Sequence, residues 1–274
     1  MSARVLDTLL PQLRHEPTAR RVRALVAGEV VVDSTRAVHV WEPRRLLPAY
    51  AVPLADVRGE LVPAADGSPE PGSHGFRLPN GQVVLDPSVP FAVHSADGEA
   101  LDLSAAGRNL PGAAFRPADP DLRQLVLLDT AAFDVWLDED EPVVDHPRDP
   151  FHRLEILPSS RTVRIELDGV LLAESERAAL LFEGVMLPVR AYLPPGDVRV
   201  PLQPSATRTR CAYKGEATYW SVELDGRTIR DLAWTYEEPT PEAGALAGRV
   251  CFFDERVDVV LGGEARPRPR TPWS

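Results

Sequence analysis

Two apolar runs joined by Asp-Gly make up the stretch Val163-Arg-Ile-Glu-Leu-Asp-Gly-Val-Leu-Leu-Ala173. Asp-Gly is the preferred two-residue turn of a β-hairpin, because both of its positions tolerate a positive φ. The same pattern returns downstream, where Ser221–Leu224 and Thr228–Ala233 flank Asp225-Gly226. Both stretches therefore predict antiparallel hairpins and a mainly β chain.

Helical signals are few along the chain. A leucine-containing segment at Val5–Leu13 is one candidate, and a short turn at Pro241–Leu246 is the other, since proline can open a helix and Gly248 can end it. We expect few short helices.

The chain also contains an internal duplication. Shifting it by 141 residues aligns Pro17–Arg58 with Pro158–Arg199, and 14 of these 42 positions are identical, where unrelated sequences would give roughly three. Identical pairs include Ser34/Ser175, Arg36/Arg177, Glu42/Glu183 and Asp56/Asp197. We expect two homologous small β modules, at 1–150 and 151–265, and a tail at 266–274. The first copy has a Gly/Pro-rich tract instead of the motif described next, and we interpret it as degenerate.

One side chain stands apart in composition. Of the 30 basic residues, Lys214 is the only lysine, and it lies in Cys211-Ala212-Tyr213-Lys214-Gly215. An ammonium is a compact charge that burial can neutralise, so a lysine can act as a base or a Schiff-base nucleophile, whereas guanidinium stays charged. Lys214 is therefore the first candidate for chemistry.

Composition excludes several classes of protein. A net charge of -11 and a sequence pI near 5.1 disfavour nucleic acid and anionic membranes as partners. No apolar run suits a membrane span or an export signal, so we expect a cytoplasmic protein.

Cys211 and Cys251 are expected to be free thiols. With no Cys-x-x-Cys pair and no Gly-rich nucleotide loop, we expect neither a metal nor a cofactor. The oligomeric state stays open.

The run from Cys211 to Trp220 resembles the signature of the domain of unknown function 427 family. Its other matches are Glu174-Ser175, Tyr192-Leu-Pro-Pro-x-Asp197-Val198, Ala233-Trp234-x-Tyr236, Pro239 and Phe252-Phe253. The resemblance is close over Phe151–Gly262 and weak over the first module, and Ala212 stands where the family usually has proline. It implies two small, curved, mostly antiparallel domains of the β-tent (Mss4-like) kind. It implies no settled activity, and the zinc of many β-tent proteins is not carried over.

Around the lysine we expect a small-molecule site. Tyr213 and Glu174 would tune its proton affinity, and Cys211 lies nearby as a weaker candidate. Aromatic side chains would line an apolar pocket, where desolvation would lower the pKa of Lys214; these are Tyr192, Trp220, Trp234 and Tyr236. The alternative is that Lys214 pairs with a buried carboxylate such as Glu174 or Asp197 and only stabilises the domain.

The junction between the modules is a second candidate. Trp136–Arg153 contains His146, Arg148 and His152 among several carboxylates, the composition of an acid–base site, of a metal site, or of a solvated linker with salt bridges. The spacing matches no standard metal motif. A wall or lid between the modules is the interpretation we favour, with His152 as a catalytic candidate and His146 and Arg148 as substrate-binding candidates.

These features lead to three hypotheses. The first is a cofactor-independent lyase, hydrolase or isomerase acting on a small carbonyl- or carboxylate-bearing metabolite near the domain interface, with Lys214 as base, Schiff-base former or oxyanion stabiliser. The second is a binding module that holds an anion on Lys214 and stacks it on Trp220 or Trp234. The third is a scaffold that binds a partner protein.

Overall fold

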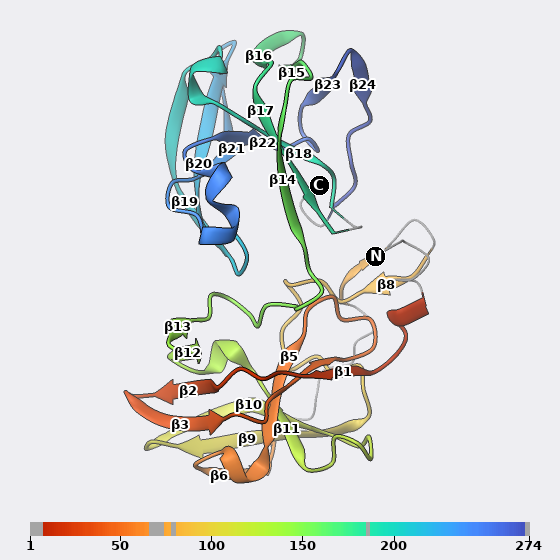
Figure 1. Cartoon of the computed structure of the whole chain (residues 1–274), viewed down its shortest axis with the longest axis vertical. Helices are drawn as coiled ribbons and strands as arrows, with labels where there is room; N and C mark the ends of the chain where they lie inside the picture. Colours follow the sequence, from red (N-terminus) through yellow and green to blue (C-terminus); the bar gives the residue numbers. More distant parts are fainter. Residues whose placement is uncertain (1–7, 66–73, 78–80, 185–186, 272–274) are drawn as a thin grey trace. The chain divides into compact units, whose positions relative to one another are not determined.

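The computed structural model describes residues 8–65, 74–77, 81–184 and 187–271. Its chain divides into two compact units, residues 2–150 and residues 151–274, here called the first and second modules. In Figure 1 the first module runs from red to yellow-green and the second from green to blue. Each module is described by itself.

The first module consists of a seven-stranded and a four-stranded antiparallel sheet, with a small two-stranded sheet between β6 and β9 in the chain. The larger sheet has the order β1 (Arg14–Pro17), β4 (Val38–Trp41), β5 (Ala49–Pro53), β11 (Leu125–Leu128), β10 (Arg108–Pro117), β9 (Gly98–Ala105) and β6 (Glu60–Pro63). The smaller sheet has the order β13 (Glu141–Pro142), β12 (Val135–Asp138), β2 (Val22–Val26) and β3 (Glu29–Ser34). The two-stranded sheet pairs β7 (Phe76–Arg77) with β8 (Val83–Val84). Two 3-10 turns, at Leu54–Asp56 and Thr130–Ala132, complete this module.

The second module repeats this plan. Its seven-stranded sheet has the order β14 (Leu154–Ser159), β17 (Ala178–Glu183), β18 (Arg190–Leu193), β22 (Val250–Phe252), β21 (Arg227–Tyr236), β20 (Gly215–Leu224) and β19 (Leu202–Cys211). Its four-stranded sheet has the order β16 (Val170–Ser175), β15 (Val163–Leu167), β23 (Asp258–Leu261) and β24 (Glu264–Arg266). Two 3-10 turns, η4 (Pro195–Asp197) and η5 (Pro241–Leu246), complete it.

Three residues that are identical in the two copies, a serine, an arginine and an aspartate, make the same contacts in both modules. In the first, Ser34 Oγ donates to Asp56 Oδ2 at 2.7 Å and Arg36 Nη2 donates to Asp56 Oδ1 at 2.6 Å. In the second, Ser175 Oγ and Arg177 Nη2 make the matching bonds to Asp197, at 2.7 and 3.0 Å. The prediction of a mainly β chain with two similar antiparallel domains and few short helices is confirmed.

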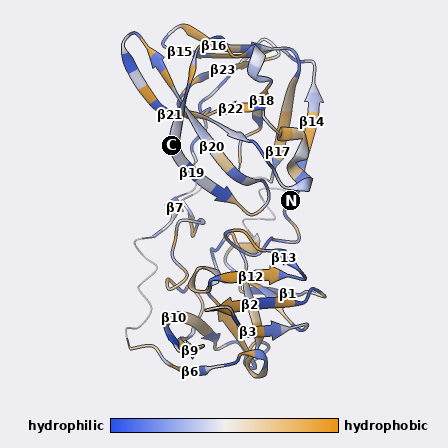
Figure 2. Ribbon diagram, turned by 90° about the vertical axis from the view of Figure 1, so that its left-hand side faces the viewer, coloured by the Kyte–Doolittle hydropathy of each residue, from blue (hydrophilic) through white to orange (hydrophobic). Residues whose placement is uncertain are grey.

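Each main core lies between the two sheets of its module. Val163, Ile165 and Val259 from the smaller sheet pack with Leu180 and Phe252 from the larger one. Alternate side chains of a strand point to opposite faces, and β15 accordingly shows alternating buried and half-buried positions. In Figure 2, hydrophobic and hydrophilic positions both occur along the strands of each sheet.

A second, smaller cluster covers the outer face of the seven-stranded sheet of the second module. It contains Tyr192, Trp234, Tyr236 and Cys251, and η5 adds Ala243 and Leu246 to it. This cluster is relevant to function because it lies on the sheet beside Lys214.

The two hairpin turns lie where the Asp-Gly pairs predict them. Asp168 and Gly169 have φ values of 53° and 81°, and Asp225 and Gly226 have 48° and 72°.

The expected helix at Val5–Leu13 falls partly outside the described residues, and of its described part only residues 8 and 9 are helical. No helix in the described part of the chain is long and apolar enough to cross a membrane.

Candidate functional site

A tight turn at the end of the β19–β20 hairpin presents Lys214. Cys211 ends β19 and pairs with Gly215, which begins β20. The Lys214 amide donates to the Cys211 carbonyl at 3.3 Å, and the Lys214 carbonyl accepts the Thr240 amide at 3.2 Å. Gly215 has φ +95°, a conformation that side chains with a Cβ adopt only with strain. The turn is therefore fixed on both sides of the lysine.

The amine of Lys214 is held by a glutamate. Lys214 Nζ lies 2.5 Å from each of the two carboxylate oxygens of Glu183, the last residue of β17. Only 8% of Lys214 and 7% of Glu183 are exposed. A buried ion pair of this kind is costly to break, because the remaining partner becomes an uncompensated buried charge.

His152 contacts the same carboxylate. Its Nε2 lies 3.2 Å from Glu183 Oε1, and its ring stacks on Tyr213 with 4.0 Å between the ring centroids. Since an ionised carboxylate only accepts, Nε2 carries a proton, and in the neutral imidazole Nδ1 then carries the lone pair. The His152 side chain is 20% exposed, and no residue of the described part of the chain bonds to its Nδ1. Glu183 thus joins a lysine and an accessible imidazole.

The charge state of Glu183 follows from its neighbours. Burial alone would raise the pKa of its carboxyl, but the hydrogen bond from His152 and the charge of Lys214 outweigh burial and lower the pKa below the usual 4.5. The carboxylate is therefore ionised at neutral pH, and it forms an ion pair with Lys214.

Three of the four expected aromatic residues lie together on the outer face of the sheet. Tyr192, Trp234 and Tyr236 are at most 8% exposed, and Trp234 Nε1 donates to Tyr192 Oη at 3.1 Å. Burial raises the pKa of both tyrosines well above 10. Their rings make a packed apolar layer in which little surface is open to a ligand.

The fourth expected aromatic residue, Trp220, does not belong to this layer. It packs on the core between the two sheets, and its Nε1 donates to Thr235 Oγ1 at 2.8 Å. Trp220 is therefore not placed to stack on a ligand bound to Lys214.

Two other expected site residues lie apart from the amine. Glu174 is on β16 in the four-stranded sheet, where it accepts a bond from Arg164 at 3.3 Å. Cys211 ends β19 as a half-buried free thiol. Glu183 takes the position next to Lys214 that we expected for Glu174, or for Asp197 as a structural partner.

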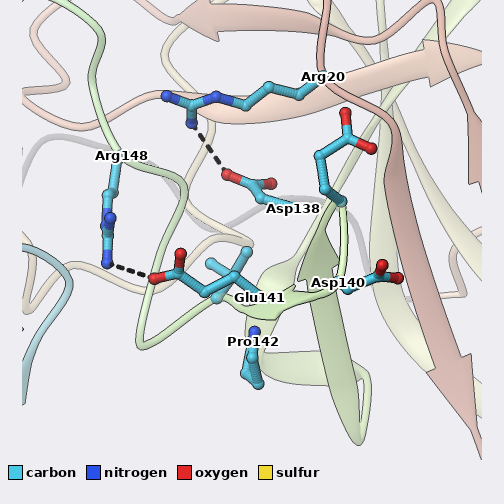
Figure 3. Close-up of a pocket in the computed structure, with 8 residues that line it drawn as sticks. Arg20, Asp138, Asp140, Glu141, Pro142 and Arg148 are labelled. Carbon is cyan, nitrogen blue, oxygen red and sulfur yellow. Dashed lines mark hydrogen bonds and ion pairs between the residues drawn. The ribbon is translucent and has the colours of Figure 1, made fainter.

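The junction segment, Trp136–Arg153, belongs to the first module up to residue 150 and to the second module from residue 151. Figure 3 shows Arg20 directed at Asp138 and Arg148 directed at Glu141, around a hollow of about 700 Å³. The two ion pairs measure 2.9 Å and 3.2 Å. His146 lines a different hollow of this module. The structure thus brings His152 to Lys214 within the second module, whereas Arg148 and His146 line hollows of the first.

Sequence reasoning missed Glu183 as a site residue. It lies 31 positions before Lys214, with no motif linking the two. One signal was present, since Glu183 is an identity of the internal repeat, matched by Glu42. In both copies this carboxylate lies at the end of the equivalent strand, the last residue of β17 in one and directly after β4 in the other.

The equivalent glutamate of the first module has a different basic partner. Glu42, 2% exposed, contacts His94 Nδ1 at 3.0 Å and accepts the amides of Ser95 and Ala96 at 2.8 and 3.1 Å. These residues lead into β9, which corresponds to β20 in the sheet order. His94 in the first module therefore occupies a place comparable to that of Lys214 in the second.

Comparison with known proteins gives a family but no activity. The model of a family described as a domain of unknown function (DUF427) matches residues 14–70 and 155–263. The two matched regions lie in the two modules, as expected for tandem copies. No curated protein matches the chain.

Proposed function

We propose that this chain, which belongs to the DUF427 family, is a cofactor-independent enzyme that moves a proton on a small carbonyl- or carboxylate-bearing metabolite. His152 is the base in this proposal, and Glu183 and Lys214 are the groups that orient and charge the site. The observation that carries it is the single buried carboxylate bonded to both the imidazole and the ammonium.

The imidazole has the arrangement of a general base. A base needs a free lone pair, access to the substrate, and a third group that fixes its tautomer. His152 has Nε2 on Glu183, a stacked Tyr213 that limits rotation of the ring, and a partly exposed side chain. Glu183 would also stabilise the imidazolium that forms when His152 takes a proton.

Lys214 supports the reaction through its charge. An ammonium has three N–H donors, and Glu183 takes two of them. The third has no acceptor among the described residues. In this proposal it binds a substrate oxygen, on which negative charge develops when a neighbouring C–H loses its proton. An ammonium has no lone pair, so we assign Lys214 oxyanion stabilisation rather than Schiff-base formation.

Hydrogen exchange on a carbonyl substrate tests this reaction class. The protein is incubated in D₂O with pyruvate, 2-oxobutyrate or hydroxyacetone, and loss of the proton NMR signal next to the carbonyl is followed. We expect exchange above the buffer rate for at least one probe, loss of it in His152→Gln, and retention of it in the control His146→Gln. The proposal is contradicted if no probe exchanges above the buffer rate, or if exchange persists in His152→Gln.

The first module supports a second candidate function. There Glu42 binds His94 and two backbone amides, which is how a carboxylate fixes a loop. If Glu183 only fixes the β19–β20 turn in the same way, the domain is a scaffold. In that case His152→Gln and Lys214→Arg would change stability alone, and no small molecule would shift the NMR signals of His152.

A further inference from the structure

A cavity in the first module lies against Glu42. Its volume is about 290 Å³, and all the residues that line it belong to the first module. This is about ten times the share of one water molecule in the liquid, and just below the usual range of ligand pockets. The space suits a small molecule of one ring or a short chain.

Most of the wall is apolar. Val40, Leu47, Leu85, Pro90, Phe91 and Leu128 contribute to it. Such a wall favours a ligand with a hydrocarbon body, because covering apolar surface releases water.

The only arginine in the wall uses both of its terminal nitrogens on carbonyl groups of a loop. Arg45 donates through Nη1 and Nη2 to the carbonyls of Val89, Pro90, Phe91 and Val93. Its Nε is buried and lies 3.6 Å from Glu42 Oε1. The guanidinium is thus occupied in holding the loop between β8 and β9, and it does not offer an anion site.

Two carboxylates of the wall, Asp86 and Asp129, each have one oxygen without a bond to a described residue. Asp86 uses Oδ1 for the amide and hydroxyl of Ser88, at 2.9 and 2.6 Å. Asp129 uses Oδ1 for the Ala131 amide at 3.0 Å. The second oxygen of each carboxylate has no bond to the residues that the structure describes. Asp145 adds a third carboxylate to the wall.

The carboxyl group of Asp129 is destabilised in its ionised form by burial. Burial raises the pKa of its carboxyl, although the Ala131 amide and the charges of Arg45 and His94 act in the opposite direction. A ligand that brings a positive charge would relieve this cost.

We propose that this cavity binds a small primary ammonium compound with an apolar body, through Asp129 and Asp86. The wall has open carboxylate oxygens on Asp86 and Asp129, and these oxygens match the N–H groups of a cation. All the residues that line the cavity belong to the first module, so this proposal does not rest on the proposed acid–base site of the second module.

Three cyclohexyl compounds of similar shape and different charge test the proposal. Cyclohexylammonium, cyclohexanol and cyclohexanecarboxylate are titrated into the full chain, and amide NMR shifts are followed in both modules. We expect cyclohexylammonium alone to bind at millimolar concentration or below, with shifts at Asp86, Asp129 and their neighbours. Equal binding of cyclohexanol, tighter binding of the carboxylate, or no shifts in the first module would overturn it.

Conservative variants test the role of the carboxylate. Asp129→Asn keeps an oxygen for the Ala131 amide and loses the charge, so we expect cyclohexylammonium to bind about tenfold to hundredfold more weakly. Asp121→Asn, at an exposed position outside the cavity, is the matched control and should bind as the parent does. An unchanged dissociation constant in Asp129→Asn contradicts the proposed contact. Lys214→Met should bind the probe normally, which separates this site from the proposed enzymatic function.

Discussion

Lys214→Met removes one partner of the buried ion pair and should destabilise the second module. Both side chains are almost enclosed, with 10% and 7% of their surface exposed. Loss of one partner of a buried pair costs about 3–5 kcal/mol. Glu183 keeps His152 as a donor, so we expect a loss near the lower end, about 3 kcal/mol.

Urea unfolding followed by the amide NMR signals of the second module measures this loss, because two modules can unfold separately. Arg210→Met in the same hairpin is the control, since Arg210 is 71% exposed and lies 3.5 Å from Glu216. An exposed pair contributes about 0–1 kcal/mol. Adding Glu183→Gln to Lys214→Met should recover part of the loss, because the buried charge is then gone.

The ion pair should also make the stability of the second module depend on pH. The folded pKa of Glu183 is below 4.5, so its stabilising contribution is complete above that pH and is lost as the pH falls through the folded value. The difference between the parent and Lys214→Met should therefore narrow in acid. A loss below about 1 kcal/mol, or a difference that does not change between neutral and acidic pH, would refute a buried charge pair.

Two further predictions concern single positions. Burial lowers the pKa of His39 below 6.5, and neither ring nitrogen has a partner in the described chain, so the first module should lose stability as the pH falls through 6.5. His39→Leu introduces the residue found at the repeat-equivalent position, Leu180, and should remove the part of the stability loss that comes from protonating His39. Urea unfolding at several pH values measures this. The same pH profile in the parent and in His39→Leu would contradict the prediction. Gly215→Ala should cost about 1–3 kcal/mol, since its Cβ would lie 3.3 Å from the Glu238 carbonyl oxygen at φ +95°. Gly226→Ala, with φ +72° and open space, should cost less, about 1 kcal/mol, and equal urea midpoints for the two variants would contradict this account.

Local signals in the sequence predict the fold well. Asp168-Gly169 and Asp225-Gly226 specify hairpin turns without help from distant residues, because the turn geometry depends on the φ values of those two positions. The internal repeat then supplies the architecture, since Asp56 and Asp197 make the same bonds in both copies.

The site was harder to predict because its contacts are not local. The unusual composition identified Lys214, and the junction segment identified His152, but nothing in the sequence joined them. Glu183 does so only after β17 lies next to β14 and its end meets the β19–β20 turn. For Trp220 the two-residue period of the strand does predict the observed face, since it places Trp220 with Val222 and Leu224, and all three lie at the core between the sheets. The expectation that Trp220 lines a ligand pocket disregarded this period.

The tautomer of His152 is the most direct test of the proposed acid–base site. Nitrogen-15 chemical shifts of the two ring nitrogens, recorded on the neutral imidazole, distinguish the protonated nitrogen from the one with the lone pair. The account predicts a proton on Nε2 in the parent, where Glu183 accepts it at 3.2 Å, and a mixture of both tautomers in Glu183→Gln. A proton on Nδ1 in the parent, or the same tautomer with and without the carboxylate, would contradict it.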